Sequence, residues 1–115
     1  MLAVEFCNCF EIRMGSPFRM CELHLTGTWT PDLERYGWLP IQARSNDGRF
    51  LALAKWDTAG NLPGFRLLVI DEAQQTFEEG QRIQGCCESV IFDGDVILWK
   101  ALPDLQGKIR FPFSS

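Results

Sequence analysis

The sequence predicts a mainly β protein: an antiparallel meander of about eight short strands, with at most one short helix. Two observations predict this class. Apolar and polar residues alternate with a period of two along most of the chain, as on half-buried strands. Glycine, asparagine and aspartate stand at the tight turns between these segments. The 115 residues fit one domain. We therefore assign 1–115 to a single β-rich domain that forms a small sandwich or a partly closed barrel.

The first half of the chain predicts two strands and one irregular segment. Residues 2–13 alternate between apolar and polar side chains, and after a turn the pattern resumes over 18–25. Residues 27–37 break it. The run Thr30-Pro-Asp-Leu-Glu34 has the features of a helix start, with threonine at the N-cap and proline at the first helical position. We expect a loop or a single helical turn there.

The second half predicts strands joined mostly by short turns. Ser45-Asn-Asp-Gly48 and Asp93-Gly94 each predict a hairpin. The run 65–70 is almost wholly apolar, which indicates a central strand covered on both faces, and the polar run 76–83 suits a sheet edge. The predicted strands of this half are 38–44, 49–56, 65–70, 76–83, 86–92, 95–102 and 108–111.

Three runs within 47–102 follow the rhythm of strands and turns in a β-propeller blade. They are Asp-Gly-Arg-Phe-Leu-Ala-Leu-Ala, Pro-Gly-Phe-Arg-Leu-Leu-Val-Ile-Asp and Val-Ile-Phe-Asp-Gly-Asp-Val-Ile-Leu-Trp. This part of the chain resembles one blade, covers about half of the sequence and does not repeat, whereas a propeller needs several blades. The resemblance implies an antiparallel meander and carries no activity with it.

Composition and charge exclude several classes of function. Eleven basic against 15 acidic side chains give a net charge of −4, and nucleic-acid binding needs a basic surface. No apolar run approaches the ~20 residues of a membrane helix, and the N-terminus lacks the basic start of a secretory signal. We expect a cytoplasmic protein that binds neither nucleic acid nor a membrane. Phosphate-binding glycine loops are also missing from the sequence.

The five cysteines predict structural thiols. Their odd number, without an export signal, favours reduced side chains over a disulfide framework. Cys7 and Cys9 share one face of the predicted strand and could hold a soft metal ion, whereas adjacent Cys86 and Cys87 point to opposite faces. Because these spacings differ from the usual zinc pairs, we expect no metal and no other cofactor. The fifth thiol is Cys21.

His24 is the only histidine and the first candidate for catalysis. Glu22 lies on the same face of the predicted strand and could orient its imidazole. Cys21 points to the other face, so a nucleophile would have to be Cys7, Cys9, Cys86 or Cys87, brought near by folding. No known nucleophile motif accompanies these residues. Histidine beside glutamate is more often a surface pair, so we assign no catalytic residue and lean against an enzyme.

Aromatic residues near the two loops indicate a binding surface instead. Tryptophan favours partly solvated positions such as interfaces and the mouths of pockets, although a small β core also uses large aromatic side chains. The loops are 27–37 and 57–64, and we expect function where they meet. The predicted binding residues are Trp29, Tyr36, Trp38 and Trp56, with Arg35, Asn61, Arg66 and His24 as polar candidates.

Acidic residues concentrate in the segment 71–95, which holds seven acids and a single base, Arg82. Such a segment can steer a basic partner, or it can simply solubilise an edge of the sheet. We predict a non-catalytic interaction module that docks on a basic protein or associates with itself. The alternative is a small-ligand β-barrel or an unrecognised enzyme, with an aromatic-lined pocket near His24.

Overall fold

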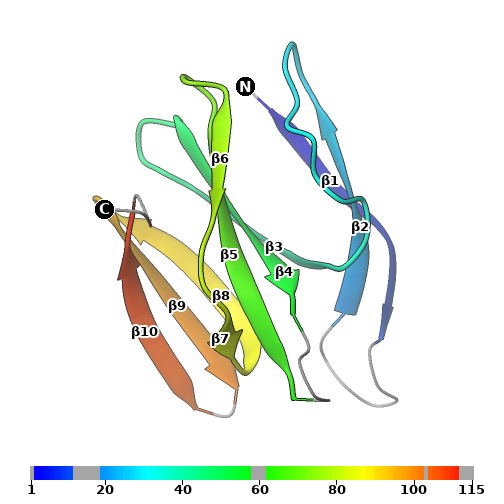
Figure 1. The fold of residues 1–115 in the computed structure, drawn as a ribbon, viewed down its shortest axis with the longest axis vertical. Helices are drawn as coiled ribbons and strands as arrows, with labels where there is room; N and C mark the ends of the chain where they lie inside the picture. The colour runs from blue at the N-terminus through cyan, green and yellow to red at the C-terminus, as the bar shows by residue number, and fades with distance from the viewer. Residues whose placement is uncertain (1, 12–18, 58–61, 103, 112–115) are drawn as a thin grey trace.

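The computed structural model describes residues 2–11, 19–57, 62–102 and 104–111, and these form ten strands in two antiparallel sheets (Figure 1). The larger sheet has the order β1-β2-β3-β4-β5-β6, with β7 also paired to β5, and the smaller has the order β10-β9-β8. The strands are β1 (Ala3–Glu11), β2 (Arg19–Thr26), β3 (Trp38–Arg44), β4 (Phe50–Trp56), β5 (Gly64–Asp71), β6 (Thr76–Glu79), β7 (Ile83–Gln84), β8 (Cys86–Asp93), β9 (Val96–Leu102) and β10 (Leu105–Arg110). The predicted antiparallel meander is confirmed, and of the two predicted arrangements the sandwich is the one observed.

One predicted strand, 76–83, is divided into β6 and β7. Between them, Arg82 lies against Gly64, where a Cβ atom would come within 2.5 Å of the guanidinium. Its Nε donates to the carbonyl oxygen of Asp57 at 3.0 Å, and its Nη2 donates to that of Leu62 at 2.8 Å. Pairing with β5 is interrupted between the pairs Leu68–Glu79 and Phe65–Ile83, and the Arg82 side chain packs over Gly64 in this interval.

Both predicted hairpin turns are present. In the first, the Ser45 hydroxyl donates to Asp47 at 2.6 Å, and Gly48 has a positive φ of 76°. In the second, Asp93 pairs with Val96, so the loop is Gly94-Asp95 and lies one residue beyond the predicted Asp93-Gly94. Gly94 has a φ of 63°, and glycine at the first loop position is what a type II′ hairpin requires.

The irregular segment 27–37 is a loop without a helical turn. Hydrogen bonds to its backbone carbonyl oxygens help to hold it against the sheet. The backbone N–H of Leu23 donates to the carbonyl oxygen of Arg35 at 2.7 Å, and the indole N–H of Trp38 donates to that of Glu34 at 2.7 Å. The helix-start pattern yields to these tertiary contacts.

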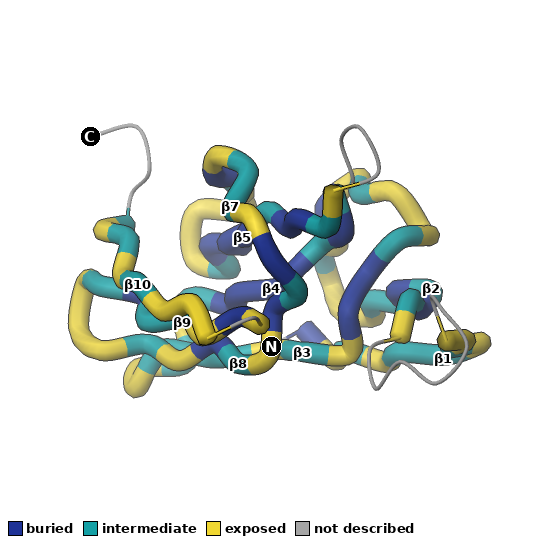
Figure 2. Tube along the Cα trace, turned by 90° about the horizontal axis from the view of Figure 1, so that it is seen from below, coloured by how far each residue is buried: buried dark blue, intermediate teal, exposed yellow. Residues whose placement is uncertain are grey.

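The core consists of two apolar clusters on opposite faces of β4 and β5. One cluster packs these strands against the smaller sheet, and the ring of Phe65 meets Trp99 edge to face at 5.8 Å between centroids. The other packs them against the apolar face of β1 and β2, which bend away from β3 after the single residue pair Cys21–Trp38. Figure 2 shows the buried stretches concentrated in β4 and β5. The predicted central strand, covered on both faces, is confirmed as β5.

The strands named by the β-propeller resemblance do form a meander. They do not form a single blade, because β4, β5 and β6 belong to the larger sheet and β8 and β9 to the smaller. A blade is one sheet. The resemblance therefore extends to local strand order alone.

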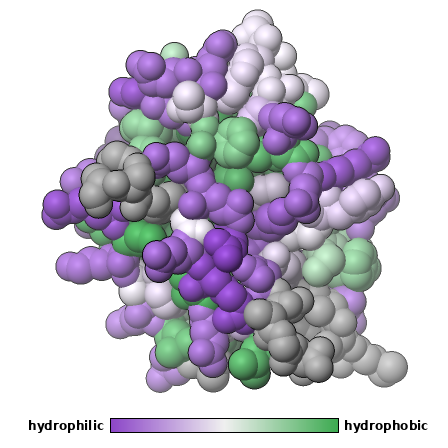
Figure 3. All heavy atoms as spheres, viewed as in Figure 1, coloured by the Kyte–Doolittle hydropathy of each residue, from purple (hydrophilic) through white to green (hydrophobic). Residues whose placement is uncertain are grey.

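Polar side chains cover most of the face shown in Figure 3, and apolar side chains appear there in scattered patches. Across the described ranges, no helix has the length and apolar character needed to cross a membrane.

Candidate functional site

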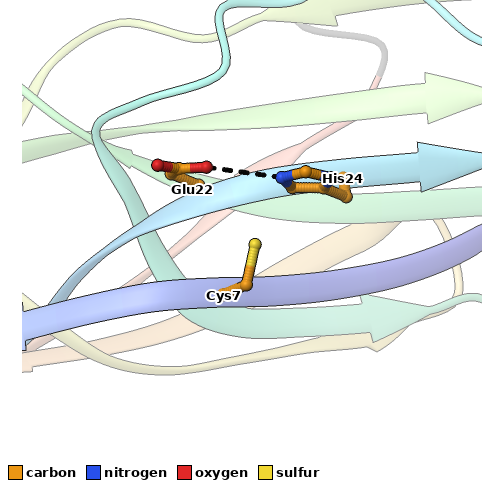
Figure 4. Close-up of side chains that lie close together, drawn as sticks. All are labelled: Cys7, Glu22 and His24. Atoms are coloured by element: carbon orange, nitrogen blue, oxygen red, sulfur yellow. Dashed lines mark hydrogen bonds and ion pairs between the residues drawn. The ribbon is translucent and has the colours of Figure 1, made fainter.

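A polar cluster occupies the face of the β1–β2 hairpin that does not pack on β4 and β5. Cys7 pairs across the ladder with Glu22, and Glu5 pairs with His24, which places all four residues on one face. The thiol of Cys7, the carboxylate of Glu22 and the imidazole of His24 have atoms within 4.8 Å of one another (Figure 4). His24 Nε2 lies 3.4 Å from Glu22 Oε2, as expected if the carboxylate orients the ring.

A β-bulge at Asn8 gives this cluster its composition. Asn8 has a φ of 50°, and the register of β1 with β2 shifts between Cys7 and Phe10. The extra residue turns Cys9 to the opposite face, where it forms a disulfide with Cys21. The prediction that Cys7 and Cys9 share a face is therefore wrong. The prediction of reduced thiols is wrong for Cys9 and Cys21.

The surroundings shift the pKa values of Glu22 and Cys7 in opposite directions. Desolvation alone would raise the pKa of Glu22, but hydrogen bonds with His24, Asn8 and Arg35 outweigh it and lower that pKa. For Cys7, desolvation and then the charges of Glu22 and Glu5 raise the pKa of the thiol. Reactive cysteines have depressed pKa values in electropositive surroundings. The environment of Cys7 is the reverse of one that activates a nucleophile.

Besides His24, two more of the predicted binding residues lie at this cluster. Arg35 Nε donates to Glu22 Oε2 at 2.9 Å, on the same oxygen that contacts His24. Tyr36 follows with 63% of its surface exposed, and the Arg35 guanidinium lies 5.9 Å from the centre of its ring.

The other predicted binding residues lie elsewhere. Trp38 and Trp56 are buried in the core, with Trp56 donating its indole N–H to the carbonyl oxygen of Arg19 at 3.0 Å. Trp29 is half-buried against the β1–β2 side of the core. Arg66 pairs with Asp57 at 2.5 Å. Asn61 lies outside the described residues. The tryptophans mainly serve the core, the alternative that their number also allowed.

An open groove of about 660 Å³ lies at one end of the sandwich. The start of β4, the end of β5 and β6 form one wall, and the β8–β9 turn together with Phe111 forms the other. Its apolar lining residues are Phe50, Val69, Phe77 and Phe111, and its ionisable ones are Arg49, Asp71, Glu78 and Asp95. The expected pocket near His24 and the tryptophans is not at this place, and the recess that Trp29 lines holds only about 60 Å³.

Arginines from outside the acidic segment neutralise part of it. Asp71 binds Arg49 at 2.8 Å, and Glu72 binds Arg44 at 2.9 Å. Arg44 also donates to the carbonyl oxygen of Leu2, which fastens the start of β1 to this corner. Within 71–95, Asp71 and Glu72 are thus paired with arginines from outside the segment, and the negative charge is not spread evenly.

Sequence reasoning identified Cys7, Glu22 and His24 as possible neighbours but missed the groove. The groove residues come from five separate stretches of chain, and only the acidic segment gave any signal for them. Comparison with protein-family models, curated proteins and solved structures finds no match to this chain.

Proposed function

We propose that this protein is a non-catalytic interaction module that binds an extended, basic segment of a partner protein along β6. The observation that carries the proposal is the position of β6. It is the last strand in the order of the larger sheet, and Thr76, Phe77 and Glu78 line the groove. An extended peptide can pair with such an edge through main-chain hydrogen bonds, and its alternate side chains then enter the groove.

The charges around the groove favour a basic partner. Arg49 and Asp71 bind each other in two hydrogen bonds of 2.9 and 2.8 Å, and Glu78 and Asp95 are the other two carboxylates that line the groove, at its rim. Asp95 lies 3.9 Å from Arg110, and both side chains are at least 70% exposed, so this pair is weak and open to exchange. Lysine or arginine on the partner would complement these carboxylates.

The apolar residues that line the groove favour apolar side chains between those basic residues. Phe50 and Phe111 meet edge to face with 4.8 Å between ring centroids. Val69 lies beside them, in the core cluster that faces the smaller sheet. A segment that alternates apolar with basic residues would match both the apolar lining of the groove and the carboxylates at its rim.

A second copy of this chain fits the same edge less well. Two antiparallel β6 strands would bring Glu78 and Glu79 of each copy close together, and like charges opposite one another destabilise a ladder. The raised pKa of Cys7 in turn argues against a cysteine nucleophile on the hairpin. These two observations support a basic partner and a non-catalytic role.

Synthetic eight-residue peptides test the proposal. One alternates valine with lysine, and two matched peptides carry glutamine or glutamate in place of lysine. We expect the lysine peptide to bind most tightly, to weaken as salt is added, and to shift amide NMR signals of β6, Phe50 and Phe111. In the double variant Glu78→Gln, Asp95→Asn its affinity should fall about tenfold, or ~1.4 kcal/mol.

Asp93→Asn is the matched control, because Asp93 adjoins the same turn but does not line the groove. This variant should bind the lysine peptide as the unaltered protein does. Equal binding of the glutamate peptide, or signal shifts confined to β1, would overturn the proposal. A concentration-dependent dimer weakened by the double variant would assign the edge to self-association instead.

A further inference from the structure

The polar cluster on the β1–β2 hairpin combines three kinds of metal ligand on two adjacent strands. Cys7 offers sulfur from β1, and Glu22 and His24 offer oxygen and nitrogen from β2. In Figure 4 the Cys7 thiol points towards β2, between the other two side chains. Backbone pairing fixes all three on one face, so their arrangement does not depend on a loop.

The spacing of these atoms is close to that around a tetrahedral zinc ion. Zinc–nitrogen and zinc–oxygen bonds of 2.0–2.2 Å place the two ligand atoms about 3.4 Å apart. His24 Nε2 and Glu22 Oε2 are 3.4 Å apart. The sulfur of a bound thiolate would lie about 3.6 Å from either atom. The ligand atoms all lie within 4.8 Å of one another, so Cys7 has to approach by at most about 1.2 Å.

The donor set selects the class of ion. Sulfur and imidazole nitrogen are ligands of zinc and its transition-metal neighbours, whereas calcium and magnesium prefer oxygen alone. Glu5, exposed and opposite His24 in the ladder, stands beside the three ligands and adds negative charge. It or a water molecule would complete four-fold coordination.

The bulge at Asn8 keeps this thiol apart from the disulfide. Cys9 is committed to Cys21 on the other face, while Cys7 is not disulfide-bonded and is only half-buried. Arg35 opposes a cation, because its guanidinium binds Glu22 Oε2 at 2.9 Å. Its side chain is 56% exposed, however, so it can move away or remain on one carboxylate oxygen.

We propose that Cys7, Glu22 and His24 form a binding site for one Zn²⁺ ion on the β1–β2 hairpin. The site lies apart from the groove and does not depend on the interaction proposed there. The test uses the metal alone, on the 115-residue chain with its Cys9–Cys21 disulfide intact.

Zinc and cobalt titrations provide that test. We expect one ion per chain, a rise in Tm with zinc, and a cobalt complex with a sulfur-to-metal charge-transfer band and intense tetrahedral d–d bands. Cys7→Ser and His24→Gln should each weaken zinc binding by more than about 100-fold, because the loss of a mere supporting partner already costs 10- to 100-fold. Cys7→Ser should also abolish the charge-transfer band.

Two variants serve as comparisons. Cys86→Ser removes another half-buried thiol, on β8, and should bind zinc as the unaltered protein does. Arg35→Gln removes the neighbouring positive charge and should tighten binding severalfold. Circular dichroism of each variant verifies that the fold is kept. Unchanged affinity in both Cys7→Ser and His24→Gln, a cobalt spectrum without the sulfur band, or loss of binding in Cys86→Ser would overturn the proposal.

Discussion

Asp71 joins the start of β4 to the turn after β5 through one carboxylate. It accepts two hydrogen bonds from Arg49, at 2.9 and 2.8 Å, and its Oδ1 also accepts the backbone N–H groups of Ala73 and Gln74 at 3.1 Å each. The bonds from Arg49 are the main reason why the pKa of Asp71 lies below its usual 3.8, although desolvation opposes them. Asp71 is thus a negative charge that the folded state stabilises.

We expect Asp71→Asn to lower the free energy of unfolding by ~1–3 kcal/mol at pH 7, because it leaves Arg49 without its charged partner. A depressed pKa in the folded state contributes stability above the usual value of 3.8, and this contribution disappears as the pH falls through the folded pKa. The gap between the two proteins should therefore narrow below about pH 4. Urea unfolding at a series of pH values measures it.

Asp93→Asn is a suitable control, since Asp93 is exposed at the end of β8. It should change stability by less than about 0.5 kcal/mol at any of these pH values. A gap for Asp71→Asn that stays constant down to pH 2 would contradict the role given to its charge.

At the residue scale, the sequence could predict the pair Glu22 and His24 because alternation on a strand sets their shared face. It could name Cys7 only as one of several partners, since pairing between strands decides which thiol comes near. The reversal of Cys9 was beyond prediction. This bulge has a positive φ at Asn8, and asparagine adopts such angles in turns as well, so the residue type alone does not place a bulge there.

At the scale of elements, the β1–β2 hairpin pairs with β3 through the single residue pair Cys21–Trp38. Its apolar face packs on β4 and β5, and hydrogen bonds to Arg35, Arg44 and Trp56 attach it further. The Cys9–Cys21 disulfide joins its two strands to each other. The two cysteines are 12 residues apart in sequence, and closing a loop of that size stabilises a fold by roughly 3 kcal/mol.

We expect the double variant Cys9→Ser, Cys21→Ser to lose roughly 2–3 kcal/mol of stability in urea unfolding. Hydrogen exchange should show where: amides of β1 and β2 should lose protection first, while those of β4 and β5 should open only with the whole molecule. Cys86→Ser, which breaks no disulfide, is the comparison. Equal loss of protection in β2 and β5 would show that the hairpin does not open separately.

The sequence predicted the strands well because most of them are half-buried and alternate cleanly, and because β5 is apolar throughout. Its failure among the elements is the predicted strand 76–83, whose pairing with β5 is interrupted between β6 and β7, where Arg82 bonds to the carbonyl oxygens of Asp57 and Leu62. The segment 27–37, expected as a loop or a single helical turn, is the loop, and Leu23 and Trp38 bond to its carbonyl oxygens. Local patterns contain no information about such partners.

At the scale of the whole molecule, the sandwich depends on two cores that share β4 and β5. Cys87 lies in the core facing the smaller sheet, with none of its surface exposed, and burial raises its pKa to about 12. A thiol reacts as its thiolate. Cys87 therefore reports whether the two sheets have separated.

We expect an alkylating reagent at pH 8 to modify Cys87 only when the sandwich unfolds, so its labelling should follow the urea transition measured by fluorescence. Cys7 and Cys86 are half-buried and should react earlier, which provides the comparison within one molecule. Mass spectrometry of the peptides distinguishes the three sites. Labelling of Cys87 in native buffer at the rate of Cys86 would mean that β8 detaches without global unfolding.

The position of the groove could not be predicted from the sequence at this scale. It lies where the start of β4 meets the residue after β10, and Phe50 and Phe111, about 60 positions apart in the chain, are in contact there. The local acidity of the chain was visible beforehand. Which acids are neutralised by Arg44 and Arg49 depends on how the strands are ordered in space.

The bulge at Asn8 determines which mutations at this position keep the Cys9–Cys21 disulfide. In a regular strand, residue 8 would face Cys21, and Cys9 would turn outward beside Met20. Deleting Asn8 would therefore preserve the cross-link, because Cys9 would then follow Cys7 in ordinary alternation. Replacing Asn8 with a stiff β-branched residue would instead favour the regular strand. Residue 8, and not Cys9, would then lie opposite Cys21, and the disulfide could not form. The hairpin tolerates a shorter chain at this point better than a stiffer one.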